Sequence, residues 1–145
     1  MERDLTWIAK VVPDFDLSRI PSDLHEFIPA DKTDLEAVTA LKASLYERLR
    51  PILPVLLTWM QDLNWPVAQA LVPVLASIGA HLVKDLEPIL HSEDEMWKYW
   101  ILTCLVDTPD GALAKALQPA LQKIEPGESE DIRAIISSIR TRHFT

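Results

Sequence analysis

The segment His91-Ser92-Glu93-Asp94-Glu95 places an imidazole and three carboxylates within five residues. A histidine beside carboxylates could act as a general base or bind a hard or borderline metal. The same residue types suit a helix start, where a serine caps the helix and acidic side chains interact favourably with the helix dipole. No second cluster of histidines and acids lies at a matching spacing, so we favour the structural interpretation. An enzyme or metal site around His91, Glu93, Asp94 and Glu95 stays open as the alternative.

Nucleophilic and phosphate-binding motifs are not recognisable in this sequence. Cys104 is the sole cysteine, which excludes an internal disulfide, and its apolar neighbours predict a buried thiol. There is no G-x-S-x-G motif, and Gly79, Gly111 and Gly127 are too dispersed for a phosphate-binding loop. We therefore expect a protein that is not an enzyme, with no catalytic residue, no metal and no cofactor assigned.

The charge balance constrains the partners. Lys and Arg number 14 and Asp and Glu 22, giving a formal net charge of −8. Nucleic-acid binding needs a basic face, so we expect neither DNA nor RNA as a partner, and no membrane. A basic protein suits the acidic balance better. No segment approaches the ~20 apolar residues of a membrane span, and the N-terminus lacks the apolar run of a signal peptide. A cytoplasmic monomer or weak dimer is the expectation.

The elements that must position these residues are helices. Apolar residues recur at i, i+3, i+4 and i+7 in successive runs, which is the spacing of one helix face. The runs are Leu49, Ile52, Leu53, Leu56, Leu57 and Met60; Val67, Leu71, Val74, Leu75 and Ile78; Leu82, Val83, Leu86, Ile89 and Leu90; Trp97, Trp100, Ile101, Cys104 and Leu105; Leu113, Leu117, Ala120, Leu121 and Ile124; and Ile132, Ile135, Ile136 and Ile139. Short connections between the runs predict antiparallel neighbours.

Helix boundaries are predicted from capping signals and prolines. Three capping-box matches begin at Thr33, Ser44 and Ser92, and Thr108 followed by Pro109 resembles an N-cap and first helical residue. Gly79 is a natural helix stop. Three prolines fall inside apolar runs and should kink or shorten their helices: they are Pro54, Pro73 and Pro119.

Two markers repeat with a similar period. Pro51, Pro88 and Pro119 each precede a small or apolar residue and a leucine, and they lie 37 and 31 residues apart. Trp65 and Trp97 lie 32 residues apart, each three residues after an aspartate. Periods of ~30–40 residues are typical of stacked helical hairpins. The expected fold is all-α, a short right-handed superhelix of about three hairpins in one domain spanning 1–145, with an irregular segment and a short helix in 1–30 and repeats in 31–142.

The stretch from Asp62 to Ala68, DLNWPVA, resembles the start of a HEAT repeat, although Ala68 and Gln69 stand where HEAT repeats often carry arginine. FIPADKTDLEAV (27–38), WMQDLNWPVA (59–68) and WKYWIL (97–102) together resemble a small bacterial family of uncharacterised proteins. The resemblance covers about residues 24–140. It implies a HEAT-like α-solenoid and no agreed activity, so no site residue is carried over.

Some HEAT-like folds also resemble DNA glycosylases for alkylated bases. Such enzymes need a strongly basic groove to hold phosphates. The second helix of each predicted hairpin offers side chains of mixed charge instead, among them Lys84, Asp85, Glu87 and Lys123. This enzyme class is therefore disfavoured.

Aromatic residues and turns supply the candidate binding surface. Trp97 and Trp100 share the apolar stripe and are predicted in the core, whereas Lys98 and Tyr99 are predicted on the surface. Trp65 lies in a turn before Pro66 and is expected to join adjacent repeats or stay partly exposed. The function expected is a non-catalytic protein-interaction module that binds and neutralises a basic protein partner. Its predicted contact residues are Asp62, Asn64, Trp65, Glu93, Lys98 and Tyr99.

Overall fold

The structure is a computed structural model that describes Trp7, Ile8, Ser18 and residues 20–144. Every element among these residues is a helix and none is a strand, which confirms the all-α class. Backbone contacts divide the chain into two compact units, Met1–Val74 and Leu75–Thr145, and each is described by itself. The short helix predicted within residues 1–30 was expected near residues 4–11, which lie largely outside the described residues.

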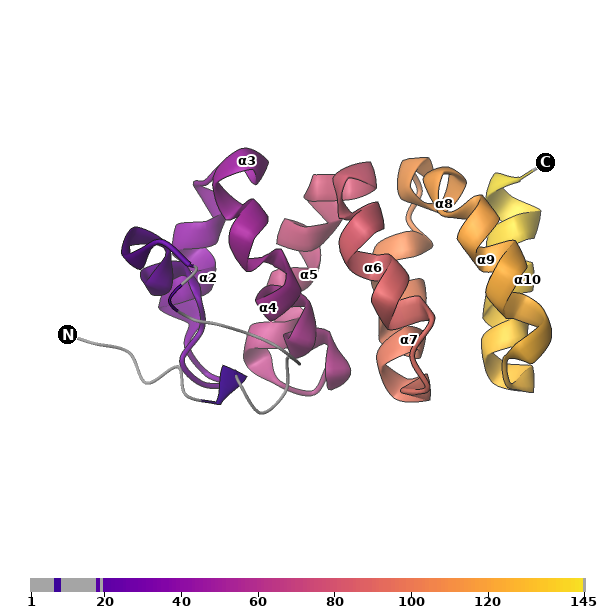
Figure 1. Ribbon diagram of the computed structural model, residues 1–145, viewed down its shortest axis with the longest axis horizontal. Helices are drawn as coiled ribbons and strands as arrows, with labels where there is room; N and C mark the ends of the chain where they lie inside the picture. Colours follow the sequence, from indigo (N-terminus) through magenta and orange to yellow (C-terminus); the bar gives the residue numbers. More distant parts are fainter. Residues whose placement is uncertain (1–6, 9–17, 19, 145) are drawn as a thin grey trace. The chain divides into compact units, whose positions relative to one another are not determined.

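The N-terminal unit consists of short helices joined by tight connections (Figure 1). Its elements are η2 (Ser22–Phe27), α2 (Leu35–Lys42), α3 (Tyr46–Leu49), η3 (Arg50–Ile52), α4 (Leu53–Thr58), η4 (Trp59–Gln61) and the first part of α5 (Pro66–Ile78). The run from α3 to η4 is almost continuous. Pro51 and Pro54 lie at the starts of η3 and α4, where a missing backbone N–H costs least.

The core of this unit follows the predicted stripes. All six apolar residues predicted between Leu49 and Met60 are at most 1% exposed. The predicted stripe residues of α5 that belong to this unit are also buried: Val67 and Leu71 are 0% exposed and Val74 is 7% exposed. The backbone N–H of Val67 donates to the carbonyl oxygen of Lys32 (2.9 Å), which ties the start of α5 to the turn before α2. Helical periodicity therefore located this core correctly.

The C-terminal unit holds the remaining helices (Figure 1). They are η5 (Gly79–Leu82), α6 (Val83–Leu90), α7 (Glu95–Ile101), the π-helical turn η6 (Leu102–Val106), α8 (Ala112–Ala116), α9 (Gln118–Ile124), η7 (Glu125–Gly127) and α10 (Glu130–His143). Within this unit α6 contacts both α7 and α9, and α10 contacts α7. Equivalent helices of successive pairs therefore lie against one another, α6 on α9 and α7 on α10.

The apolar stripe of α7 differs from the prediction by one residue. We expected 97, 100, 101, 104 and 105 to face the core, whereas the buried residues are Lys98, Ile101, Leu102, Leu105 and Val106. The helix continues into the π-helical turn, where the N–H of Asp107 donates to the carbonyl oxygen of Leu102 (2.9 Å). One residue corresponds to about 100° around a helix. The face that carries Trp97, Trp100 and Cys104 is therefore only half-buried.

Most of the predicted helix caps are wrong by one or two residues. The N-cap of α2 is Asp34, not Thr33, and that of α7 is Asp94, not Ser92, because each aspartate accepts from the third backbone N–H after it. The Ser44 box is also wrong, since Leu45 occupies the N-cap of α3 and gives no side-chain cap. Ser129, which was missed, caps α10 by accepting from the N–H of Ile132 (3.3 Å).

The break between α7 and α8 was also predicted incorrectly. The helix expected to start at Thr108-Pro109 begins later, at Ala112, after Gly111 with φ 72°. Pro119 lies at the start of α9, which is distinct from α8, and Pro73 lies inside α5. Two short helices, α8 and α9, therefore replace the single kinked helix that was predicted around Pro119. Proline is tolerated best in the first turn of a helix, which is where Pro119 lies in α9.

One helical stretch among the described residues, Pro66–Leu90, is long and apolar enough to cross a membrane by length and composition, with a mean hydropathy of 1.6. The expectation that no segment approaches this length is therefore wrong. Core helices pass the same test. Leu71, Leu75, Leu82 and Leu86 of this stretch are fully buried inside the protein, and Gly79 interrupts it with φ 63°.

Gly79 ends α5 as predicted, and its left-handed backbone gives a test. A Cβ atom at this position would meet nothing within 4 Å. The substitution Gly79→Ala therefore measures the cost of the left-handed backbone conformation alone, without a steric clash. We expect the free energy of unfolding to fall by about 1–2 kcal/mol, because left-handed φ disfavours L-residues by that amount. Urea denaturation with an unchanged m-value measures it.

Gly127→Ala is the matched control for this prediction. Its Cβ would also meet nothing within 4 Å, but its φ is not in the left-handed region. That variant should be neutral or slightly more stable, because alanine reduces the entropy of the unfolded chain. Equal destabilisation by the two substitutions would contradict the assignment of Gly79 as the helix stop.

Candidate functional site

The six residues predicted to bind a partner fall in different units. Asp62, Asn64 and Trp65 belong to the N-terminal unit, and Glu93, Lys98 and Tyr99 belong to the C-terminal unit. The surroundings of each group therefore belong to its own unit. The partner-binding role of these residues stays a prediction.

The turn before α5 is held by its aspartate, as the sequence indicated. The Asn64 N–H donates to Oδ1 of Asp62 (2.9 Å), and the Trp65 N–H donates to the Asp62 carbonyl oxygen (3.3 Å). The side-chain amide of Gln69 in α5 donates to the carbonyl oxygen of Leu63 (3.0 Å). Such turns, in which an aspartate accepts from the backbone two residues later, are common before helices. The turn presents Trp65 half-buried and Asn64 exposed.

Trp65 belongs to a cluster of three tryptophans that sequence reasoning missed. Its ring meets Trp59 edge to face, with centroids 5.6 Å apart, and Trp59 meets Trp7 in the same manner at 5.0 Å. Trp59 is 7% exposed and Trp7 is half-buried. The spacing of Trp59 and Trp65 carried a weak signal, since they lie on both sides of one turn. Nothing in the sequence connected Trp7 to them.

A cavity of about 300 Å³ opens beside this cluster, which we call the tryptophan pocket. The three indoles form much of its wall, and its other lining residues are Ala30, Asp31, Thr58 and Gln61. The Thr58 hydroxyl is already occupied, because it donates to the carbonyl oxygen of Val55 (2.6 Å). The indole N–H groups of Trp7 and Trp59 are buried without a hydrogen-bond partner. The pocket is therefore mainly aromatic, with few polar groups.

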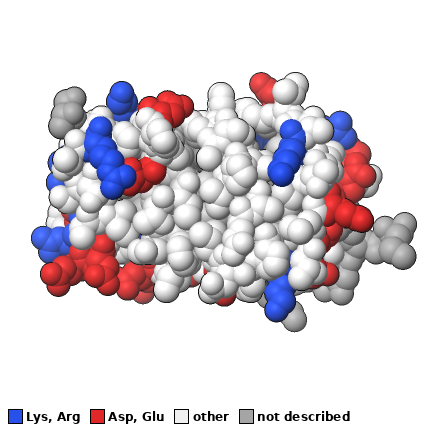
Figure 2. Space-filling view, turned by 180° about the vertical axis from the view of Figure 1, so that it is seen from behind, with Lys and Arg blue, Asp and Glu red and all other residues white. Residues whose placement is uncertain are grey.

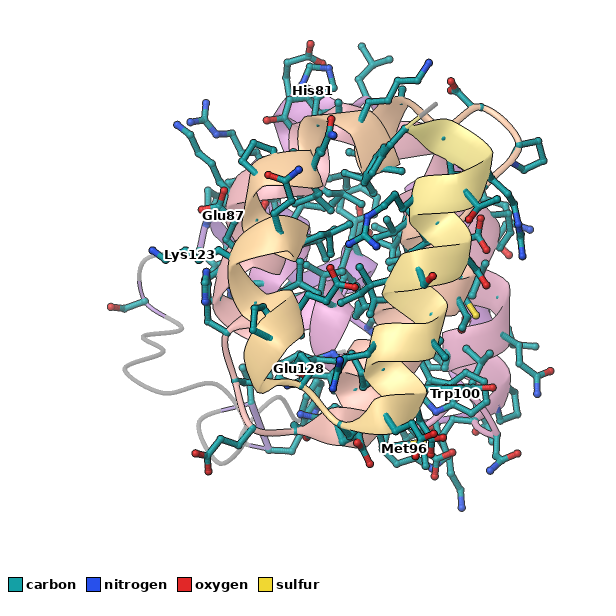
Figure 3. The ribbon with its side chains drawn as sticks, turned by 90° about the vertical axis from the view of Figure 1, so that its right-hand side faces the viewer. His81, Glu87, Met96, Trp100, Lys123 and Glu128 are labelled. Atoms are coloured by element: carbon teal, nitrogen blue, oxygen red, sulfur yellow. The ribbon has the colours of Figure 1, made fainter. Side chains whose placement is uncertain are left out.

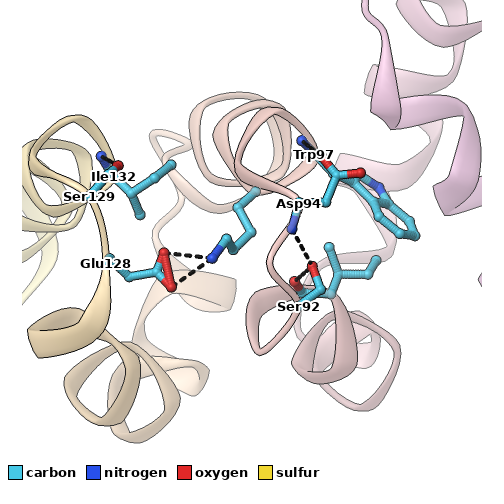
Figure 4. A network of polar contacts seen from close by, with 8 residues as sticks. Ser92, Asp94, Trp97, Glu128, Ser129 and Ile132 are labelled. Carbon is cyan, nitrogen blue, oxygen red and sulfur yellow. Dashed lines mark hydrogen bonds and ion pairs between the residues drawn. The ribbon is translucent and has the colours of Figure 1, made fainter.

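The segment His91–Glu95 serves the start of α7. Oδ1 of Asp94 accepts from the Trp97 N–H (3.1 Å), and the Ser92 hydroxyl donates to the carbonyl oxygen of Ile89 (2.7 Å) (Figure 4). Among the described residues no group of three or more His, Cys, Asp or Glu side chains is arranged to hold a metal ion. The hydrogen bonds of Ser92 and Asp94 give these two side chains structural roles at the start of α7.

Lys98 is the clearest error in the predicted surface. Its side chain is 6% exposed, and its ammonium group donates to both carboxylate oxygens of Glu128, at 2.6 and 2.7 Å (Figure 4). Glu128 lies in the connection between α9 and α10, so the ion pair fastens α7 to the second helix pair of this unit. A buried lysine requires such a partner, because removing an ammonium group from water is unfavourable.

Lys98 points inward, and its neighbours on α7 form an apolar groove against α10. We call this the α7–α10 groove; its volume is about 860 Å³ and its apolar lining residues are Met96, Tyr99, Trp100, Ile132, Ala134 and Ile135. Met96 is 56% exposed and Tyr99 38% exposed, which confirms the surface placement predicted for Tyr99. Figure 3 shows Met96 and Trp100 beside α10 at its N-terminal end. The ring of Tyr99 meets Trp100 edge to face at 4.8 Å.

The charged residues that line this groove are acids. Glu95 lies at the start of α7 and Asp131 in the first turn of α10, and no Lys or Arg is among the described lining residues. Glu93 and Glu130 nearby in the sequence are exposed as well. Figure 2 shows acidic side chains gathered along the lower left of the face drawn there, toward the C-terminal end of the chain. The groove thus combines apolar walls with negative charge.

Trp97, Trp100 and Cys104 were predicted in the core and are only half-buried. The cause is the rotation of α7 described above, which gives their places in the core to Lys98, Leu102 and Val106. Replacing Trp97 or Trp100 with alanine should therefore cost less than the loss of a fully buried aromatic residue, which is about 3–5 kcal/mol.

The chain was compared with models of protein families and with curated proteins. The family model described as "Domain of unknown function (DUF5071)" matches residues 27–138, which is most of the chain and includes both tryptophan motifs. No curated protein matches the chain.

The Lys98–Glu128 ion pair can be tested by substituting Glu128. We expect Glu128→Gln to lower the free energy of unfolding by about 3 kcal/mol, because it leaves the Lys98 ammonium buried without an anion. The double variant Lys98→Met, Glu128→Met should lose less than Glu128→Gln alone, since apolar residues of similar volume often replace a buried ion pair at little cost. Denaturant melts of both variants and the two single Met variants give the coupling free energy.

The exposed pair between Arg48 and Asp23 is the control for this cycle. Their side chains are 51% and 65% exposed, and the pair is 3.2 Å long. Breaking an exposed pair should cost at most about 1 kcal/mol. Similar losses for Asp23→Asn and Glu128→Gln would show that Lys98 is not buried as described.

Proposed function

We propose a function from the chain's own geometry, because this chain belongs to the DUF5071 family, whose description is a domain of unknown function. The proposed function is a non-catalytic protein-interaction module of HEAT-like design that binds a basic protein segment. The α7–α10 groove is the contact site. The exposed apolar surface of this groove, bordered by acids, is the observation that carries the proposal.

The HEAT-like design rests on three observations. The chain is all-helical in its described part, its markers repeat every 31 to 37 residues, and in the C-terminal unit α6 lies on α9 and α7 on α10. Stacking of equivalent helices is the arrangement by which repeats of this length bury a continuous core. Proteins of this design bind partners through extended helical surfaces, which supports an interaction role.

The apolar content of the groove supports protein contact. Aromatic residues and methionine are enriched in interfaces, and tyrosine and tryptophan supply much of the binding energy in them. Met96, Tyr99 and Trp100 are adjacent here, and two of them are among the large hydrophobic side chains most exposed in the described residues. A groove between two helices also suits an incoming amphipathic helix, which lays its apolar face between them.

The negative charge of the α7–α10 groove indicates which kind of protein segment would bind there. Glu95 and Asp131 line the groove, no Lys or Arg is among its described lining residues, and the chain carries a net charge of −8. A segment with leucine-like residues on one face and Lys or Arg at its flanks matches both features. Attraction between acidic and basic surfaces speeds association and lowers affinity for acidic competitors. The proposed partner is therefore a basic amphipathic helix of another protein.

Two model peptides test this function: a labelled amphipathic helix of Leu and Lys, and its analogue in which Glu replaces Lys. We expect the Leu/Lys peptide to bind in fluorescence polarisation and the Leu/Glu peptide not to bind. Met96→Ser with Tyr99→Ser should weaken binding by roughly tenfold or more, as is usual for removal of a central aromatic contact. Glu95→Gln with Asp131→Asn should weaken it by about two- to fivefold and flatten its dependence on salt.

Leu45→Ser is the matched control. Leu45 is 76% exposed and lies in the N-terminal unit, so its loss removes exposed apolar surface without touching the groove. Its affinity for the peptide should equal that of the unmodified protein. Equal binding of both peptides, or an equal effect of Leu45→Ser and the groove variant, would argue against the function. Capture from a lysate with the same variants, followed by mass spectrometry, would then identify the natural partner.

A further inference from the structure

The two helices that flank the α7–α10 groove run in the same direction, because polar contacts join both their starts and their ends. Lys98 of α7 pairs with Glu128, which lies just before α10. At the other end Asp107, which follows η6, accepts from Nη1 of Arg142 (2.7 Å) and lies 3.1 Å from Nε2 of His143. Both of these residues belong to the last turn of α10. Each end of the groove therefore corresponds to the same end of both helices.

The end of the groove beside the helix starts is acidic. Glu95 is the first residue of α7 and Asp131 is the second residue of α10. Both side chains line the groove and both are exposed. Met96 and Trp100 lie at this end as well, beside Glu128 (Figure 3). A basic group of a partner therefore finds its carboxylates at one end of the groove.

The border of the groove on α10 continues beyond this acidic end. Asp131, Ile135, Ser138 and Arg142 follow the spacing i, i+4, i+7 and i+11, which keeps them on one helix face. The first two of them line the groove. Eleven residues at 1.5 Å each place Arg142 about 16 Å from Asp131 along the helix axis. A partner helix that follows this face for about three turns therefore reaches from the acids to Arg142.

The far end of this face presents positive charge to a partner. The side chain of Arg142 is 60% exposed, whereas that of Asp107, with which it pairs, is only 13% exposed. A guanidinium group has five N–H donors, and the contact with Asp107 leaves most of them facing outward. The exposed member of this ion pair is therefore the cation. The α7–α10 face thus changes from acidic to basic along its length.

We infer that the partner helix carries acidic residues in its first turn and basic residues in its last turn, and that it lies antiparallel to α7 and α10. This inference rests on the function proposed above. The basic end of the partner then lies beside Glu95 and Asp131, its acidic end beside Arg142, and its apolar side chains between them. The direction follows from the helix dipole, because acids stabilise the first turn of a helix and bases the last. A parallel helix would need the opposite and less stable layout.

A labelled helical peptide of about 15 residues, long enough for this face, tests the inference. It carries Glu in its first turn, Leu along one side and Lys in its last turn, and fluorescence polarisation measures its affinity for the full chain. We expect Asp131→Asn to weaken binding by about two- to fivefold, and to have no effect on an analogue whose last-turn Lys residues are Gln. Arg142→Gln should show the same coupling with the first-turn Glu residues, and the crossed combinations should be additive.

Arg133→Gln is the matched control. Arg133 is an exposed cation of α10, but its position two residues after Asp131 places it about 200° around the helix, away from the groove. Its loss should leave the affinity for the peptide unchanged. Arg142→Lys, which keeps the charge, should retain the coupling with the acidic end of the peptide. Circular dichroism melts show that each variant is folded.

The outcomes separate this inference from the function on which it rests. If the Leu/Lys peptide described above does not bind, the proposed function and this inference fail together. If that peptide binds but Arg142 shows no coupling with the acidic end of the new peptide, the function stands and the inference is overturned. Equal effects of Arg142→Gln and Arg133→Gln on the affinity would also overturn it.

Discussion

A charged side chain inside the apolar stripe of α7 determines how the C-terminal unit is built. An ammonium group leaves water only when an anion accompanies it, and Glu128 meets Lys98 through both carboxylate oxygens. This requirement turns Lys98 inward and fastens α7 to the connection before α10. With Lys98 inside, Met96 and Tyr99 lie on the outer side, where they form the α7–α10 groove. One buried ion pair thus links the packing of the unit to its candidate binding surface.

The sequence was sufficient for the helical class and for the cores whose stripes are purely apolar. The residues from Leu49 to Met60 and the stripe of α5 were placed correctly because every member is aliphatic or methionine, so periodicity has one solution. Periodicity failed on α7. Tryptophan is ranked as more hydrophobic than lysine, so the predicted buried face of the helix was shifted by one residue. Only the contact with Glu128, 30 residues away, makes the true face favourable, and periodicity contains no such information.

The candidate sites were predicted to the same limited extent. Tyr99 was identified as a surface residue, and the turn from Asp62 to Trp65 was recognised as a helix start, since both follow from local spacing. The tryptophan pocket was missed, because Trp7 joins Trp59 and Trp65 through tertiary contacts alone. The chain belongs to the DUF5071 family, but this membership assigns it no activity. The α7–α10 groove therefore carries the functional proposal by its own chemistry, because its apolar walls are bordered by acids and such a surface suits a basic helix.

The burial of Lys98 is tested most directly by its reactivity. Brief labelling of the folded protein with an amine-reactive reagent, followed by peptide mass spectrometry, compares Lys98 with Lys84, Lys115 and Lys123, which are exposed in the same unit. Lys98, at 6% side-chain exposure and held by Glu128, should be the slowest of the four to react and should become as reactive as the others in denaturant. Labelling of Lys98 at the rate of those three lysines in the folded protein would contradict the ion pair and the orientation of α7 that depends on it.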